Sequence, residues 1–504
     1  MENFELLMGG FATALTPMHI MLMVVGVLLG LIVGVLPGLG APNGVSLLIP
    51  LTFTMDPVSA IILLASMYWG ALFGGSTTSI LFNIPGEPSS VATTFDGYPM
   101  ARSGQSTRAL TLAFMSAGIG AFVGIVVITL LSSWAARFAL RFGAAEYFAV
   151  YFLAFCAFIG MGSASPIKTA VSLSLGLLLS TVGMDTVTGS LRLTFGIEAL
   201  LSGVSFLVVV IGLFGIGELL ATVQDGLKFR GVASRIDPRD VFKTMLELPK
   251  YITTLIRSSA VGVWMGITPG GPTAASFMSY GLARQWSKPG EKFGTGRPEG
   301  IVAPETADHS AGTCAMLPML ALGVPSSATA AVMMGGLMIW GLTPGPMLFA
   351  NQPDFVWGLI ASMYIANIVA VVLVLATVPF FAALLRIPFA IIGPMIVAIC
   401  FVGAYTVANS TFDLWLVLIF GIVGFVFNKL EFPLAPLILA MVLGSKAESS
   451  FHQSMIASDG SLGIFFSNYL VGTIMTIALG LLIIPQTLKA IQYVKSHRSV
   501  DSAA

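Results

Sequence analysis

The sequence predicts an all-α, polytopic membrane protein with about ten to thirteen transmembrane helices, arranged as an inverted repeat with broken or re-entrant helices. Of its 504 residues, 56% are hydrophobic and 9% are charged, whereas soluble domains carry about 25% charged residues. The mean hydropathy is +0.94. Apolar runs long enough to cross a bilayer follow one another, and segments rich in Pro and Gly interrupt them at matching places in the two halves.

The first apolar run, residues 18–50, contains a segment that an ordinary helix does not tolerate. Its sequence over 34–40 is Gly-Val-Leu-Pro-Gly-Leu-Gly. Proline removes a backbone donor, and glycine permits dihedral angles that other residues avoid. Because the run is too long for one helix and too broken for two complete ones, we expect a re-entrant hairpin. Before the break, glycines at four-residue spacing predict a close helix contact, alone or with a role in a site: Gly26, Gly30 and Gly34.

The next helix is expected to begin at Pro57, with Asp56 as its N-cap, and to end at a second break over 82–90. Further helices are expected over 110–131, 144–161, 167–182 and 199–222. The most polar stretch, 224–257, holds seven Lys and Arg residues and predicts a cytoplasmic connecting loop.

The second half repeats both breaks. Gly30 and Gly34 match Gly262 and Gly266 at an offset of 232 residues, and Pro37 and Gly38 match Pro269 and Gly270. Asn83-Ile-Pro85 matches Gly323-Val-Pro325 at an offset of 240. Paired helix interruptions in two halves are a sequence indicator of a transporter's binding site.

Loop charges predict that the two hairpins open on opposite sides of the membrane. The loops that flank 258–281 are both basic, which predicts a hairpin returning to the cytoplasm, whereas loop 41–56 has no Lys or Arg. Opposite orientations indicate an inverted repeat. Arg102 and Arg108 fit this scheme less well because they would face outward. The expected divisions are an N-terminal membrane repeat (1–223), the connecting loop (224–257), a C-terminal membrane repeat (258–487) and a cytoplasmic tail (488–504).

Composition and motifs argue against other classes of protein. The formal net charge of zero gives no bulk field for nucleic acid. Three scattered cysteines predict buried packing positions, with neither a disulfide framework nor a metal site. No basic segment precedes the first apolar run, so a cleaved signal peptide is not expected. Neither a Walker A loop nor His-Glu-x-x-His occurs, which favours a protein that is not an enzyme.

Short motifs in a fixed order extend along nearly the whole chain. They lie at 34–40, 82–86, 88–90, 96–100, 185–196, 303–305, 322–325, 403–405 and 434–436. In this order they resemble TctA, the large membrane subunit of tripartite tricarboxylate transporters. Three positions depart from the family's usual pattern: Asp308 and His309 stand where two amides are common, and Ser326 stands where Gly is common. Glu87 also places a carboxylate inside the second break.

The resemblance implies a multi-pass protein of the bacterial inner membrane that works with two partners. One is a small, TctB-like membrane subunit, and the other is a periplasmic, TctC-like solute-binding protein. The implied function is secondary active uptake of di- or tricarboxylates such as citrate, usually coupled to Na⁺, with no other cofactor. An anion channel and an integral membrane enzyme remain alternatives.

The breaks supply the candidate substrate site. Half-helix N-termini attract anions, so substrate carboxylates are expected against backbone N–H groups and nearby hydroxyls or amides. The candidates are Pro37, Gly38, Gly40, Asn43, Asn83, Pro85, Gly86, Ser89, Ser90, Gly270, Gly271, Pro325, Ser326 and Ser327. For Asn83 and the serines, helix capping and local backbone bonding are the alternatives.

Sodium prefers carbonyl and hydroxyl oxygens at the C-terminal ends of half-helices. The candidate ligands are Thr77, Thr78, Thr273, Thr329 and Asp308. An ionisable residue inside a membrane indicates function, but Asp308 is also a candidate helix N-cap. His309 is expected at the surface.

Overall fold

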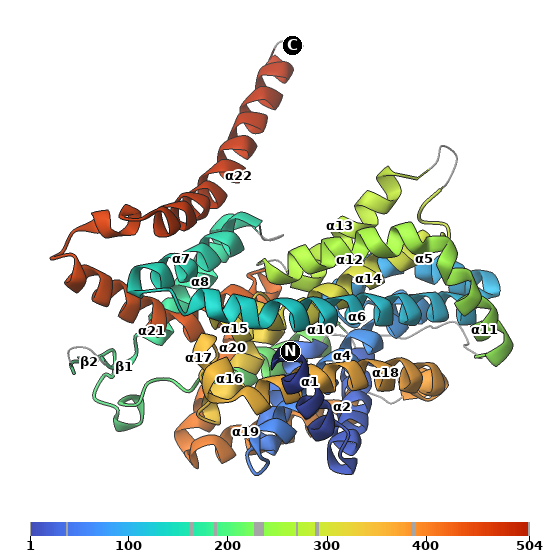
Figure 1. Ribbon diagram of the computed structural model, residues 1–504, viewed down its shortest axis with the longest axis horizontal. Helices are drawn as coiled ribbons and strands as arrows, with labels where there is room; N and C mark the ends of the chain where they lie inside the picture. The colour runs from blue at the N-terminus through green and yellow to red at the C-terminus, as the bar shows by residue number, and fades with distance from the viewer. Residues whose placement is uncertain are drawn as a thin grey trace. The chain divides into compact units, whose positions relative to one another are not determined.

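The computed structural model describes residues 2–36, 39–161, 165–185, 189–225, 236–268, 271–287, 292–384 and 389–501 (Figure 1). The described chain is almost wholly helical, which confirms the all-α prediction. Seven helical stretches are long and apolar enough to cross a membrane: Pro17–Val35, Pro57–Phe82, Pro88–Ala139, Phe206–Gln224, Pro353–Phe380, Thr411–Lys429 and Leu434–Ala457. Five shorter apolar helices accompany them: Ala144–Gly160, Pro166–Ser180, Ala328–Ile339, Gly393–Thr406 and Tyr469–Ile484.

The chain forms two compact units, and each predicted half contributes to both. Unit 1 comprises Met1–Leu140 and Ser205–Leu430. Its α-helices are α1 (Glu2–Ala14), α2 (Pro17–Val35), α3 (Gly40–Leu48), α4 (Pro57–Phe82), α5 (Val91–Met100), α6 (Ser106–Ala139), α9 (Phe206–Val210), α10 (Gly217–Asp225), α11 (Pro238–Glu247), α12 (Ile252–Ile267), α13 (Gly271–Gln285), α14 (Glu299–Cys314), α15 (Met316–Leu322), α16 (Ala328–Ile339), α17 (Pro346–Asn351), α18 (Pro353–Leu384), α19 (Phe389–Ala408) and α20 (Thr411–Lys429).

Short turns and wider helical segments connect these helices. The 3-10 turns are η1 (Ile49–Thr52), η2 (Pro88–Ser90) and η6 (Leu248–Tyr251), and the π segments are η3 (Ala101–Gln105) and η5 (Ile211–Ile216). The π segment η3 contains Gly104 in the left-handed region, with φ 87°, which allows α5 to continue into α6 across a kink.

Glycine ridges position the helices that carry the breaks. Gly30 and Gly34 of α2 lie so close to the backbone of α4 that a methyl group would overlap the carbonyls of Met67 and Ala71. Small residues of this kind let two helix backbones approach closely in a membrane. The predicted close contact of this ridge is therefore confirmed, and its partner is α4.

The second half repeats this contact. Gly262 and Gly266 of α12 lie against the carbonyls of Ala307 and Ala311 in α14. Ala307 and Ala311 follow Met67 and Ala71 at an offset of 240 residues, while the glycines follow theirs at 232. The two sequence offsets thus correspond to one packing arrangement that occurs twice.

Both short helices after the first breaks turn back along their predecessors. A side chain at Gly44 of α3 would overlap Val33 near the end of α2. In the second half, the hydroxyl of Ser279 in α13 donates to that of Ser258 in α12 at 2.6 Å. These contacts bring together residues far apart along the chain, as a helical hairpin requires.

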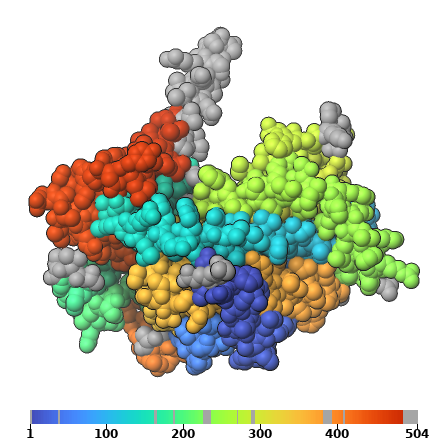
Figure 2. All heavy atoms as spheres, viewed as in Figure 1, coloured from blue at the N-terminus to red at the C-terminus, as the bar shows by residue number. Residues whose placement is uncertain are grey.

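The described part of 224–257 is structured. It contains α11 and the first residues of α12, and Glu247 of α11 pairs with Arg108 of α6 at 2.9 Å. The start of α6 therefore lies on the same side as the predicted cytoplasmic stretch, which removes the difficulty raised by Arg108. Farther along, α6 runs beside α14 (Figure 1), and α1 lies on the surface against α18 (Figure 2).

Unit 2 comprises Arg141–Val204 and Glu431–Ala504. Its elements are α7 (Ala144–Met161), α8 (Pro166–Ser180), β1 (Gly183–Met184), β2 (Leu191–Arg192), the 3-10 turns η4 (Glu198–Leu200) and η7 (Leu462–Phe466), α21 (Leu434–Ala457) and α22 (Tyr469–Asp501). The short antiparallel pair β1–β2 places Gly183 opposite Arg192. Arg192 pairs with Glu448 of α21 at 2.6 Å, which ties this pair to the helices.

Candidate functional site

Both predicted hairpin breaks are helix interruptions in the structure. In the first half α2 ends at Val35 and α3 begins at Gly40, and in the second half α12 ends at Ile267 and α13 begins at Gly271. The two starting glycines share a left-handed conformation, with φ 62° at Gly40 and φ 61° at Gly271. Four prolines and glycines at the centre of these breaks lie outside the described residues: Pro37, Gly38, Pro269 and Gly270.

The later breaks are also matched. Helix α4 ends at Asn83 with φ 58° and ψ 28°, and α15 ends at Gly323 with φ 68° and ψ 28°. Asn and Gly are the residues that adopt this left-handed conformation most readily. The correspondence at an offset of 240 residues is therefore a shared backbone geometry.

Within each half, the two breaks lie against each other. In the first half, Gly86 lies so close to the carbonyl of Gly34 that no side chain fits between them. In the second half, the hydroxyl of Ser326 donates to the carbonyl of Gly266 at 2.6 Å. Residues 86 and 326 differ by the same 240 positions, so each half joins its two breaks at the same point.

Helices α4 and α14 exchange equivalent contacts where the two halves meet. The indole N–H of Trp69 in α4 donates to the hydroxyl of Thr313 in α14 at 3.2 Å. The ring centroids of Phe73 in α4 and His309 in α14 are 4.4 Å apart. An offset of 240 converts the first pair into the second, with the two helices exchanged. A local two-fold relation produces this exchange.

The break segments of one half contact the other half. The turn η2, which follows the break at Pro85, contacts α13, and the equivalent start of α16 belongs to a helix that contacts α3. The described parts of all four breaks therefore surround the α4–α14 crossing. Irregular backbone is tolerated at membrane depth only where protein or a wet cavity covers it.

Polar side chains without hydrogen-bond partners gather at this crossing. Tyr68 and Asp308, which are equivalent at the 240 offset, are both 1% exposed, and Ser89 is 3% exposed. The Tyr68 hydroxyl, the Ser89 hydroxyl and both Asp308 carboxyl oxygens lack a hydrogen-bond partner. Asp308 lies within electrostatic reach of Ser89 and Glu87, and Tyr68 within reach of Ser327 and Asp308. Buried polar groups are usually satisfied, so a cluster of unsatisfied ones indicates a ligand site.

A second acidic group beside the crossing is fully satisfied. Glu305 of α14 accepts hydrogen bonds from Ser76 of α4 at 2.8 Å and from Thr93 of α5 at 2.5 Å. The Nδ1 atom of His309 is 3.8 Å from a Glu305 carboxyl oxygen and 4.0 Å from one of Asp308. Glu305 thus joins three helices, whereas Asp308 is left for another partner.

The sequence comparisons identify the family. The family described as "Tripartite tricarboxylate transporter TctA family" matches residues 20–439. The chain belongs to the TctA family. It is therefore a subunit of a tripartite tricarboxylate transporter and a multi-pass membrane protein, and the resemblance in the motifs is confirmed.

Two curated relatives come from Agrobacterium vitis. The chain is 37% identical, over 94% of each sequence, to an "Uncharacterized 52.8 kDa protein in TAR-I ttuC' 3'region". It is 35% identical to an "Uncharacterized protein in TAR-II ttuC' 3'region" over 43% of this chain and 90% of the relative. No solved structure matches the chain.

The predicted substrate residues of this TctA-family chain occupy different surroundings. Gly40, Asn43, Gly86, Ser89, Ser90, Gly271, Pro325 and Ser326 are buried, while Pro85 and Ser327 are half-buried. The hydroxyl of Ser90 donates to the carbonyl of Glu87 at 2.8 Å, so it caps η2. Asn83 is exposed at the end of α4. Ser89 is the predicted substrate residue whose buried hydroxyl points to a ligand.

The predicted ion ligands divide in the same way. The hydroxyls of Thr77 and Thr78 donate to the carbonyls of Phe73 and Gly75, each at 3.0 Å. Thr329 is buried near the start of α16, and Thr273 is half-buried near the start of α13. Asp308 lies within α14, at neither helix end. The expectation of a surface His309 is wrong, because its side chain is 0% exposed between α4 and α14.

Sequence reasoning assigned no role to Tyr68, Glu305 or Asp96. Asp96 is 0% exposed and accepts hydrogen bonds from the backbone N–H groups of residues 294–297, at 2.7 to 3.0 Å. The Tyr280 hydroxyl donates to its other oxygen at 2.9 Å. The signal was present in the sequence: an isolated acid beside an apolar helix requires several donors. What the sequence did not contain was the identity of those donors.

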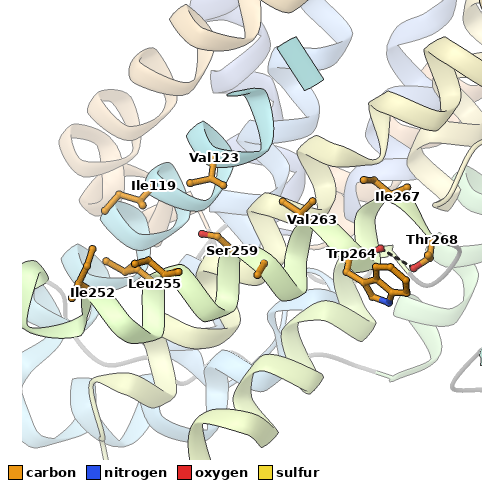
Figure 3. A pocket seen from close by; sticks show the side chains of 11 residues that line it. Ile119, Val123, Ile252, Leu255, Ser259, Val263, Trp264, Ile267 and Thr268 are labelled. Atoms are coloured by element: carbon orange, nitrogen blue, oxygen red, sulfur yellow. Dashed lines mark hydrogen bonds between the residues drawn. The ribbon is translucent and has the colours of Figure 1, made fainter. Parts of the chain in front are cut away.

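A separate pocket of about 620 Å³ lies between α6 and α12. Figure 3 shows its lining, mainly Ile, Leu and Val side chains, and the 2.8 Å hydrogen bond by which the Thr268 hydroxyl caps α12 at the Trp264 carbonyl. No charged side chain lines it. Its chemistry does not suit a carboxylate, so the α4–α14 crossing is the candidate site of this TctA-family protein.

Proposed function

We propose that this protein is the membrane carrier of a cation-coupled uptake system for di- and tricarboxylates. The observation that carries the proposal is the α4–α14 crossing, where matched helix breaks of both halves meet buried polar groups without partners. Paired broken helices at the interface of two repeats are the usual architecture of a secondary transporter's substrate site.

Two kinds of donor are available for substrate carboxylates. The N-termini of α3 and α13 carry backbone N–H groups that have no partner within their own helix. The hydroxyls of Tyr68 and Ser89 add buried side-chain donors. No described Lys or Arg forms an ion pair with Glu87, Glu305 or Asp308. Substrate recognition by neutral donors allows release, because no buried ion pair has to be broken.

The excess of acidic groups favours a coupling cation. Glu87, Glu305 and Asp308 lie near one another, and His309 is the basic side chain that faces them. An anionic substrate added to this cluster raises the electrostatic free energy unless a cation accompanies it. We propose Na⁺, bound by Asp308 and by hydroxyl or carbonyl oxygens. Among the described residues, no three His, Cys, Asp or Glu side chains are grouped as a divalent metal site would require.

Family membership supports the remaining parts of the proposal. A tripartite transporter has partner subunits, and we propose a small membrane subunit and a periplasmic binding protein that delivers the carboxylate. The proposed location is the bacterial inner membrane. The curated relatives lie beside a gene whose printed name begins with ttu, but their descriptions assign no cargo.

Counterflow in reconstituted vesicles tests the function. Vesicles containing the carrier and its small membrane subunit are loaded with one unlabelled carboxylate and offered a labelled panel, with and without Na⁺ and the binding protein. Saturable uptake that requires Na⁺ supports a coupled carrier. Saturation without any dependence on a cation gradient contradicts coupling, and single-channel conductance steps would show an anion channel instead.

A further inference from the structure

The carboxylate of Glu87 occupies the N-terminus of α3. The backbone N–H of Ala41, in the first turn of this nine-residue helix, donates to Glu87 Oε1. Gly40, the residue before it, lies against the same carboxyl group, since a methyl group there would be 3.5 Å from Oε2. Glu87 is 5% exposed. The chain therefore places its own carboxylate where a helix N-terminus attracts an anion.

The equivalent position in the second half carries no acid. Residue 327, which corresponds to Glu87 at the 240 offset, is Ser. It lies against Gly271 at the start of α13, just as Glu87 lies against Gly40. The Ser327 hydroxyl accepts from the backbone N–H of Ala330 at 3.2 Å, so it caps α16. No described carboxylate hydrogen-bonds to the first turn of α13.

A buried hydroxyl marks the α13 end as a place for a ligand. Tyr68 is 1% exposed, its hydroxyl has no hydrogen-bond partner, and it lies within electrostatic reach of Ser327. A buried hydroxyl without a partner costs about 1–3 kcal/mol, and a carboxylate at the first turn of α13 would satisfy it. Asp308 also lies near Tyr68, so the coupling cation is needed on that side.

We propose that Glu87 is a specificity-determining residue that fills one of two matched carboxylate positions, so that substrate carboxylates bind at the α13 end beside Ser327 and Tyr68. The inference rests on the proposed transport of carboxylates. It makes the two halves chemically unequal: the first half supplies a fixed carboxylate, and the second half receives the substrate's. Glu87 thereby limits how many carboxylate groups of one substrate find a helix N-terminus.

Exchanging the two residues tests this assignment. Purified full-length carrier is titrated with glutarate and with propane-1,2,3-tricarboxylate, which differ by one carboxylate, and the ligand-dependent rise in Tm gives each affinity. Glu87→Ser vacates the α3 end. The preference for the tricarboxylate over glutarate is expected to rise about tenfold, the effect of one carboxylate placed favourably at a helix N-terminus.

The converse change supplies an independent arm. Ser327→Glu places an acid at the α13 end and is expected to weaken the affinity for both ligands at least about tenfold. The double exchange, Glu87→Ser with Ser327→Glu, moves the fixed carboxylate to the other half and is expected to restore most of that loss. Such non-additivity is the sign of two positions that share one function. Glu431→Gln, which removes an acid whose side chain is 87% exposed, is the matched control.

The outcomes separate the two proposals. If wild-type carrier is stabilised by these carboxylates but the exchange leaves both the preference and the affinities unchanged, the assignment of Glu87 is overturned and carboxylate binding stands. If wild-type carrier is stabilised by neither ligand, with or without Na⁺, the proposed function fails as well. Variants that unfold are recognised by their Tm without ligand, and the double exchange then decides the question.

Discussion

The hydroxyl of Ser326 donates a hydrogen bond to the backbone carbonyl of Gly266 across 2.6 Å. This bond joins the start of one broken helix to the end of another, because Ser326 precedes α16 and Gly266 lies in the last turn of α12. A carbonyl at a helix end has no partner within its own helix. Ser326 therefore satisfies a group that the break exposes.

Removing the Ser326 hydroxyl is expected to destabilise the protein modestly. Ser326→Ala leaves the Gly266 carbonyl unsatisfied in a buried position, which costs about 1–3 kcal/mol. Thermal unfolding in detergent measures the change. Ser287→Ala is the control, because the Ser287 hydroxyl is exposed and bonds only to Arg284 nearby. Equal Tm values for the two variants would contradict this role of Ser326.

The repeated glycine contacts predict equivalent sensitivity in the two halves. A methyl group at Gly34 or Gly266 overlaps the carbonyl of the helix packed against it, and such overpacking costs about 1–3 kcal/mol. Gly34→Ala and Gly266→Ala should therefore both lower the Tm. Gly281→Ala, in α13 with open space around it, should leave it unchanged or raise it, since Ala favours a helix by about 1 kcal/mol. A fall in Tm confined to one half would argue against equivalent packing.

Asp96 is expected to hold the loop before α14 in place. Asp96→Asn removes a charged acceptor of four backbone N–H groups, and each hydrogen bond to a charged group contributes about 1.5–3 kcal/mol. Trypsin should then cleave faster at Lys292 and Arg297, which flank the loop. Cleavage at Lys243, an exposed site on α11, provides the internal control. An unchanged cleavage ratio would show that the loop is held by other contacts.

Much of the fold followed from the sequence because its signals are local. Proline and glycine break a helix wherever they occur, so the break positions and the offsets of 232 and 240 were legible without coordinates. The start of α4 was equally local: the Asp56 carboxylate accepts from the N–H groups of Val58 and Ser59, as an N-cap should.

The polar cluster was not predictable in the same way because its members come from distant segments. Tyr68 appears in the sequence as an ordinary residue of an apolar run, and only the crossing of α4 with α14 places its hydroxyl near Asp308. His309 was expected at the surface from its chemistry alone. Nothing in a run of single letters shows that Phe73 covers its ring. The roles of the predicted substrate and ion residues stay predictions.

The Tyr68 hydroxyl separates a structural role from a binding role. It has no hydrogen-bond partner, so Tyr68→Phe should leave the free energy of unfolding unchanged or raise it by about 1 kcal/mol. If the hydroxyl contacts substrate, the same variant should weaken carboxylate-dependent stabilisation by about three- to tenfold, the effect of one hydrogen bond to a charged group. Tyr147→Phe, at a half-buried tyrosine of unit 2, serves as the control. Loss of stability without loss of binding would identify Tyr68 as a packing residue.

Asp308 and Glu305 should respond differently to loss of charge. Asp308→Asn removes a carboxylate whose oxygens have no hydrogen-bond partner, so folding should be preserved. If Asp308 binds the coupling cation, the Na⁺ concentration for half-maximal uptake should rise about tenfold or more, since a charged ligand is lost. Glu305→Gln weakens the acceptor of Ser76 and Thr93 and should lower the Tm instead. Uptake rates measured against Na⁺ concentration in vesicles distinguish the two. An unchanged Na⁺ dependence in Asp308→Asn, with normal uptake, would exclude Asp308 as a cation ligand.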